Sequence, residues 1–183
     1  MRTFNDVRSE LNLQKFVGSF SGDLFCVPIA PGAPRILVRH FNRDLSAELI
    51  PAYVALLREA EAWIERDPEL ARVVRVDQPT EVGEDFIARP HRMGTSLSAY
   101  FDDEDPADPP EELSAIQSRF LARLAEGIGP ENELVARVLA RSILEATGKT
   151  LYSFPEEKFI ISDLKPTREE LEQVRTQLTN EPL

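Results

Sequence analysis

Hydrophobic residues along the chain recur with two different periods, and each period predicts one class of secondary structure. Short apolar runs separated by Gly-, Ser- and Pro-containing turns predict an antiparallel meander of three strands over residues 13–17, 23–29 and 35–41. Over residues 46–66 the apolar spacing changes to three and four, which predicts an amphipathic helix. The apolar stripe of that helix consists of Leu49, Tyr53, Leu56, Leu57, Ala60 and Ile64.

The remaining pattern adds two strands, two helices, a hairpin and a last helix. Two short strands, joined by a turn around Pro79 and Gly83, complete a five-stranded sheet. Thr167 and Glu170 have the spacing of a capping box, so they predict the start of the last helix. The predicted ranges are strands at 73–76 and 84–90, helices at 111–127 and 131–147, a hairpin of 150–154 with 158–162, and a helix from Thr167 to about Leu178.

This order of elements predicts an α+β protein. We expect a five-stranded antiparallel sheet with one packed helix, followed by a small helical part that contains one β-hairpin. Residues 1–101 would form the sheet region and residues 102–183 the helical region, within one compact domain overall. The acidic, proline-broken stretch 102–110 is interpreted as a linker, because it lacks the Gly and the spaced oxygen ligands of an EF-hand loop.

Composition and charge narrow the classes of partner. The 183 residues are 42% hydrophobic and 29% charged, which is typical of a globular protein. A net charge of −11 argues against nucleic acid or an anionic membrane as the main partner, and it suits a basic protein surface. The chain has no apolar run of signal-peptide or membrane-spanning length, and its single cysteine, Cys26, is expected to be a small core residue. Together these features predict a cytoplasmic protein.

Several motifs along residues 11–101 resemble those of protein kinases. GDLFCV at 22–27 is similar to the end of a glycine-rich loop, and ILVR at 36–39 is similar to the strand that carries the phosphate-binding lysine. The resemblance places Arg39 in the lysine position and Glu59 in the position of its carboxylate partner on the following helix. Residues 86–101 resemble the hinge between the two kinase lobes. The order of strands and helix agrees with this resemblance, which implies a five-stranded amino lobe followed by a helical lobe.

The resemblance also shows where the chain departs from the kinase pattern. GSFSG supplies only Gly18 and Gly22 for a phosphate loop, so an ordinary β-turn is an alternative. Arginine does not reproduce the geometry of the lysine, so Arg39 and Glu59 could instead be a structural pair or two surface charges.

The stretch FIISDLKPT contains Asp163, for which the resemblance allows two registers. In the catalytic-loop register the preceding His-Arg and the following Asn are missing. In the other register Asp163 corresponds to the metal-binding aspartate, with Glu145 and Thr150 in the positions of the catalytic Asp and the metal-binding Asn. An aspartate that simply ends a strand is a third interpretation. About twenty residues follow Asp163, so no activation segment is expected.

These departures lead to three hypotheses about function. The first is a degenerate, truncated, pseudokinase-like module that has no catalytic residues and binds a protein partner through the helix around Glu59 and the 102–110 linker. The second is a small acidic chaperone or immunity-type protein that covers a basic partner. The third is a nucleotide-binding phosphotransferase that uses ATP and Mg²⁺. Its site would consist of Arg39, Glu59, Asp163, Gly18 and Gly22.

No other cofactor or metal is expected, because the sequence contains no further motif for one. His40 and His91 are the only histidines, and no Cys/His/Asp group has metal-ligand spacing. A serine nucleophile in the G-x-S-x-G context is also missing. Each histidine is therefore interpreted as a polar structural residue.

Overall fold

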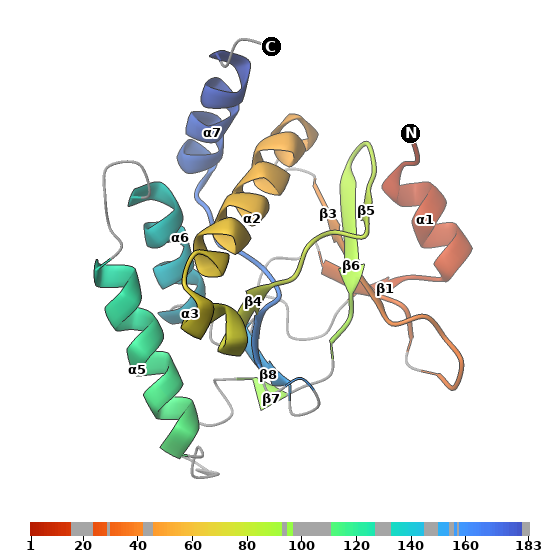
Figure 1. Cartoon of the computed structure of the whole chain (residues 1–183). Coiled ribbons are helices and arrows are strands. Elements are labelled where there is room, and N and C mark those ends of the chain that lie inside the picture. The colour runs from red at the N-terminus through yellow and green to blue at the C-terminus, as the bar shows by residue number, and fades with distance from the viewer. Residues whose placement is uncertain are drawn as a thin grey trace. The chain divides into compact units, whose positions relative to one another are not determined.

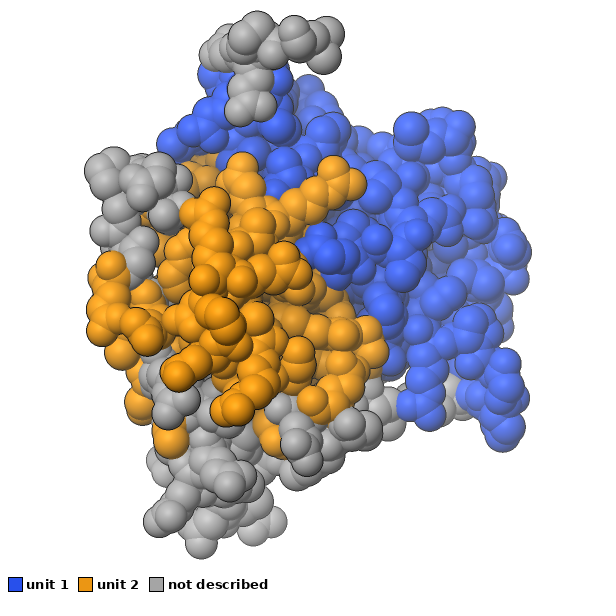
Figure 2. Space-filling view, in the orientation of Figure 1, with its two compact units in different colours: residues 1–55, 78–91, 171–183 blue, residues 56–77, 92–170 orange. Residues whose placement is uncertain are grey.

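The structure is a computed structural model that describes residues 1–15, 24–28, 30–41, 46–92, 95–96, 111–126, 133–144, 150–153, 156 and 158–180 (Figure 1). It has α+β architecture, as the sequence predicts. The predicted linker 102–110 and the predicted phosphate-loop residues Gly18 and Gly22 lie outside the described residues. The chain divides into two compact units, coloured separately in Figure 2: residues 1–55, 78–91 and 171–183, and residues 56–77 and 92–170. The expected division near residue 101 stays a prediction.

A five-stranded antiparallel sheet forms the centre of the first unit, and its strand order is β1-β2-β3-β6-β5. The predicted sheet is confirmed, with three consecutive strands and then a return of the chain to the side of β3 through β6. The elements are α1 (Phe4–Leu11), β1 (Gln14–Lys15), β2 (Leu24–Cys26), β3 (Ile36–His40), β5 (Glu81–Val82) and β6 (Phe86–Pro90). A short 3-10 turn, Ala47–Leu49, leads into helix α2 (Ile50–Glu65).

Helix α1 covers one face of this sheet, and it is not among the elements predicted from the sequence. Thr3 and Asp6 form a capping box, in which the Thr3 N–H donates to Asp6 and the Asp6 N–H donates to the Thr3 hydroxyl. The T-x-x-D spacing was a readable signal for this start. Phe4 and Val7 of α1 then pack into a core with β-strand residues that include Val38 and Phe86.

The last strand of the sheet differs from the prediction. We expected 73–76 to pair with 84–90, but the neighbour of β6 is the two-residue strand β5, joined to it by a tight turn. The Gly83 N–H donates to the Phe86 carbonyl at 2.9 Å. A Cβ on Gly83 would lie 2.0 Å from the Phe86 ring and 2.7 Å from the Arg2 carbonyl oxygen, so this turn requires glycine.

The second unit contains a four-stranded mixed sheet of order β4-β9-β8-β7. Strand β4 (Val74–Val76) joins this sheet instead of the first one, and it runs parallel to β9 (Lys158–Ile161). The predicted hairpin is confirmed as β8 (Thr150–Ser153) with β9, and β8 also pairs with β7 (Thr95–Ser96). On the other edge of β4, the Val76 N–H donates a hydrogen bond to the Glu61 carboxylate at 2.6 Å.

Helices complete the second unit. Helix α3 (Pro68–Val73) was not predicted; it begins at the N-cap Asp67, whose carboxylate accepts from two backbone N–H groups. The two predicted helices are confirmed as α5 (Glu111–Glu126) and α6 (Glu133–Leu144), which lie against each other (Figure 1). Trp63 and Phe120 make an edge-to-face contact with ring centres 6.5 Å apart. The last helix, α7 (Arg168–Asn180), begins where the capping box predicts it, and from Leu171 onward it belongs to the first unit.

Candidate functional site

Arg39 lies in β3, where it is enclosed by packing. Arg39 is only 8% exposed, and the central carbon of its guanidinium group lies 5.6 Å from the centre of the Tyr53 ring. Tyr53 is itself fully buried, and its ring meets Phe41 edge-on with ring centres 5.7 Å apart. A guanidinium over an aromatic face is a favourable contact that a lysine makes less well. Arg39 therefore contributes to the packing of β3 against the start of α2.

The other predicted site residues have different surroundings. Glu59 is exposed on α2, in the part of that helix that belongs to the second unit. Asp163 follows β9 and is 0% exposed. Arg39 belongs to the first unit, whereas Glu59 and Asp163 belong to the second. Gly18 and Gly22 lie outside the described residues.

Hydrogen bonds to the backbone fix the segment that contains Asp163 on both sides. On one side the Asp77 N–H donates to the Ile161 carbonyl at 3.0 Å and so extends the β4–β9 ladder. On the other side Ser142 of α6 accepts from the Lys165 N–H at 3.0 Å. Arg141 also donates to the Lys165 carbonyl at 2.9 Å. Asp163 therefore lies in a short connection that α6 holds in place.

A carboxylate at the start of α7 fixes the end of this segment. The Thr167 N–H donates to Glu170 at 2.7 Å, and the Glu170 N–H donates to the Thr167 hydroxyl at 3.2 Å, which confirms the predicted capping box. Arg141 donates two hydrogen bonds to the Glu170 carboxylate, at 2.7 and 2.9 Å, and Arg137 donates one at 3.0 Å. Burial by itself raises the pKa of Glu170, but the hydrogen bonds from Arg141, the Thr167 N–H and Arg137 outweigh it and lower the pKa to about 2.

The two arginines of this cluster are not among the site residues predicted from the sequence. Arg137 and Arg141 are four residues apart, so they lie on the same face of α6. That spacing was visible in the sequence, but nothing local showed that the face would meet Glu170, which comes 29 residues after Arg141. We call this group, Arg137, Arg141, Thr167 and Glu170, the α6–α7 clasp.

A second ionic network joins three separate segments of the second unit. Arg75 contacts Asp77 at 3.1 Å and Glu156 at 3.0 Å, while Arg92 contacts Asp77 at 3.3 Å and Glu156 at 3.0 Å. Asp77 is only 3% exposed, so its charge requires these partners. The four charges neutralise one another and fasten the end of β4 to the β8–β9 turn. This network therefore holds structure together and presents no unbalanced charge for catalysis.

His40 and Cys26 are reactive residue types, but each is held in the packing of the first unit. The His40 ring stacks on Phe4 with centres 4.0 Å apart, and its Nε2 lies 3.4 Å from Asp85. Cys26 is half-buried in β2, where burial raises the pKa of its thiol and so reduces its reactivity. In the part of the chain that the structure describes, no group of three or more His, Cys, Asp or Glu could hold a metal ion. None of the described helices is long and apolar enough to cross a membrane.

Comparisons of the chain with protein-family profiles, with curated proteins and with solved structures found no match. The α+β architecture and the five-stranded antiparallel sheet are therefore what the structure itself establishes. The kinase resemblance remains an interpretation of the motifs and of the order of the elements.

Proposed function

We propose that the chain is a non-catalytic, kinase-like module that binds a protein partner. The order of elements in the five-stranded sheet supports this proposal: three strands come first, then helix α2, and two strands later return to the same sheet. Apart from α3 and β4, which stand between α2 and β5 and of which β4 joins the other sheet, this is the order expected from the resemblance of residues 11–101 to a kinase amino lobe. The position of Arg39 in β3 and of Glu59 in α2 is consistent with the same alignment.

The observation that carries the non-catalytic part of the proposal is the packing of Arg39. In the resembled family this position holds a lysine that contacts two phosphates of the nucleotide. Here the side chain is buried and its guanidinium group lies over Tyr53, so phosphate binding would require it to leave a favourable contact. Phosphoryl transfer depends on positioning and on charge neutralisation, and a misplaced cation removes much of both.

The exposed part of α2 is the surface that we assign to the partner. Glu59 and Glu65 are exposed there, as are Arg58 and, directly after the helix, Arg66, so the negative charge that a partner would meet is that of the chain as a whole, −11. Charge complementarity increases association rates and selects partners of the opposite sign. The partner proposed here is therefore a protein that presents a basic surface to this helix.

A thermal-shift measurement tests the non-catalytic part. The melting temperature of the chain would be recorded with millimolar ATP and Mg²⁺ or Mn²⁺, with the same metal alone as the control. A nucleotide binder would gain about 2.7 kcal/mol at a hundredfold excess over Kd, whereas the proposal expects no shift. A saturable shift would instead favour the phosphotransferase hypothesis.

Charge reversal tests the partner surface. The variant Glu59→Lys/Glu65→Lys changes the exposed part of α2, and Glu126→Lys/Glu133→Lys makes the same change of charge on exposed positions of α5 and α6. Proteins captured by the immobilised wild type would be compared with those captured by each variant. The proposal expects a partner that the α2 variant loses and the control variant keeps. Equal loss in both variants would favour the acidic chaperone or immunity-type hypothesis, in which overall charge determines binding.

A further inference from the structure

Glu61 joins helix α2 to the outer edge of strand β4. The Asp77 N–H donates to the Ile161 carbonyl of β9, so Val76, one residue earlier, turns its backbone groups to the edge that faces away from β9. On that edge the Val76 N–H donates to the Glu61 carboxylate at 2.6 Å. Val76 is only 2% exposed, and a buried N–H without an acceptor is costly, so the Glu61 side chain supplies the acceptor that a further strand would otherwise provide.

Burial and a neighbouring carboxylate disfavour the ionised form of Glu61. Burial of the half-buried side chain is the main reason why the pKa of Glu61 lies above its usual value. The hydrogen bond from the Val76 N–H lowers this pKa, but not enough to offset burial. The charge of Glu65, one turn further along α2, raises it again. Within the fold, Glu61 therefore holds a proton more firmly than an exposed glutamate does.

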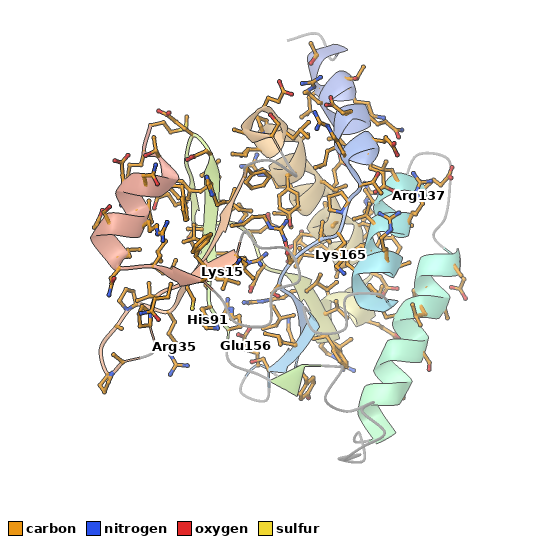
Figure 3. All side chains as sticks on the ribbon, turned by 180° about the vertical axis from the view of Figure 1, so that it is seen from behind. Lys15, Arg35, His91, Arg137, Glu156 and Lys165 are labelled. Atoms are coloured by element: carbon orange, nitrogen blue, oxygen red, sulfur yellow. The ribbon has the colours of Figure 1, made fainter. Side chains whose placement is uncertain are left out.

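Two cations of the same unit act on Glu61, but each also has another partner. Arg75 of β4 contacts Glu156 at 3.0 Å, and Glu156 lies in the turn between β8 and β9 (Figure 3). Lys158 of β9 donates to the Ala71 carbonyl of α3 at 2.9 Å. Both positive charges lower the pKa of Glu61, but their effects are smaller than that of burial. The charged groups around Glu61 therefore leave its neutral form favoured.

We propose that Glu61 and the Val76 N–H form a latch between α2 and β4 that is stronger at acidic pH. The neutral carboxyl group still offers an oxygen to the Val76 N–H, and it carries no charge for burial and Glu65 to oppose. When Glu61 ionises, both penalties return, and the contact between this half of α2 and β4 opens more readily. The latch does not depend on the proposed partner, although Glu59 and Glu65 lie on the same half of α2.

The sign of the pH dependence follows from the direction of the pKa change. A carboxyl group whose pKa is raised in the folded protein contributes its full stabilisation below about pH 4.5, the ordinary value, and loses it as the pH rises through the raised value. Glu170 has the opposite behaviour, because its pKa is lowered. Comparison of variants with the wild type at each pH separates the two groups.

Hydrogen exchange at the Val76 amide tests the latch directly, because that N–H donates to Glu61. The protection factor, corrected for the intrinsic exchange rate at each pH, would be measured from pH 4.5 to 8 in the wild type and in Glu61→Gln. Glutamine keeps an oxygen acceptor but cannot ionise. The expected result is a several-fold fall in wild-type protection as the pH rises, and no such fall in Glu61→Gln. Constant protection in the wild type, or the same fall in both proteins, would overturn the proposal.

Two further variants provide the second criterion. Glu65→Gln removes the like charge beside Glu61, so the fall in Val76 protection should become smaller and move to lower pH. Glu126→Gln removes the same charge from an exposed position on α5, and it should show the wild-type fall. If Glu65→Gln instead behaves as Glu126→Gln does, another group causes the pH dependence. That outcome would refute the latch even if Glu61→Gln fails to fold.

Discussion

Replacement of Glu170 by glutamine should destabilise the protein in a way that depends on pH. Glu170 is only 6% exposed, and in the α6–α7 clasp its carboxylate accepts hydrogen bonds from Arg137, Arg141 and the Thr167 N–H. Glutamine has the same shape and can still serve in a capping box. The substitution therefore removes the charge but keeps the packing, which isolates the electrostatic part of the clasp.

The magnitude follows from the pKa of Glu170. The difference between the ordinary value of 4.5 and the value of about 2 corresponds to about 3.4 kcal/mol, at 1.36 kcal/mol per pKa unit. The side chain of Arg137 is 45% exposed and that of Arg141 21%, so solvent screens part of this interaction. We therefore expect Glu170→Gln to lower the free energy of unfolding at pH 7 by about 2 kcal/mol.

The pH dependence has a definite sign. The pKa of Glu170 is lower in the folded protein, so the carboxylate contributes its full stabilisation above about pH 4.5 and loses it as the pH falls towards 2. The difference between wild type and Glu170→Gln should therefore be constant between pH 5 and 7 and shrink below pH 4.5. Equilibrium urea unfolding at several pH values would measure it. The single tryptophan, Trp63, is buried against Phe120 and reports the transition.

Glu172→Gln is the matched control for this experiment. Glu172 lies on the same helix, and its partner is Arg175 at a spacing of three residues, with both side chains partly exposed. An ion pair of this kind is worth about 0.5 kcal/mol or less. If Glu170→Gln loses no more stability than Glu172→Gln, or if its loss is the same at pH 3 and pH 7, the charge of Glu170 does not stabilise the clasp.

Three further predictions concern other parts of the fold. Gly83→Ala should lower the free energy of unfolding by about 2 kcal/mol, because a Cβ would meet the Phe86 ring; an unchanged melting temperature would contradict this. Asp77→Asn should cost about 2 kcal/mol in urea unfolding, because two arginines lose a buried anionic partner, and high salt should not remove the loss. Ser142→Ala should cost about 1 kcal/mol and accelerate hydrogen exchange at the Lys165 amide, which distinguishes a lost bond from a general loosening.

Local signals in the sequence determined most of the helices and strands. The change from short apolar runs to a spacing of three and four predicted the helix that contains α2, although the predicted first turn is a 3-10 turn, and a capping box located the start of α7. The capping boxes of α1 and α7 are both local, because each capping side chain and the N–H group that donates to it lie within four residues of one another. Such interactions need no tertiary contact, so they can be read before the fold is known.

The sequence did not determine which sheet each strand joins. Val74–Val76 reads as a strand in isolation, but three residues carry no information on whether the partner is β6 or β9. The choice depends on Phe159–Ile161, more than eighty residues later, and on Glu61, which satisfies an N–H of β4. Long-range pairing of this kind is decided by the burial of both strands together.

The same division applies to the charged residues. The sequence by itself identified Arg39, Glu59 and Asp163 as candidates, because their spacing resembles a known pattern. Only the tertiary structure decided that Arg39 is enclosed against Tyr53 and that Asp163 is fully buried. Burial and neighbours determine the chemistry of a charged side chain, and both depend on residues that are distant in sequence.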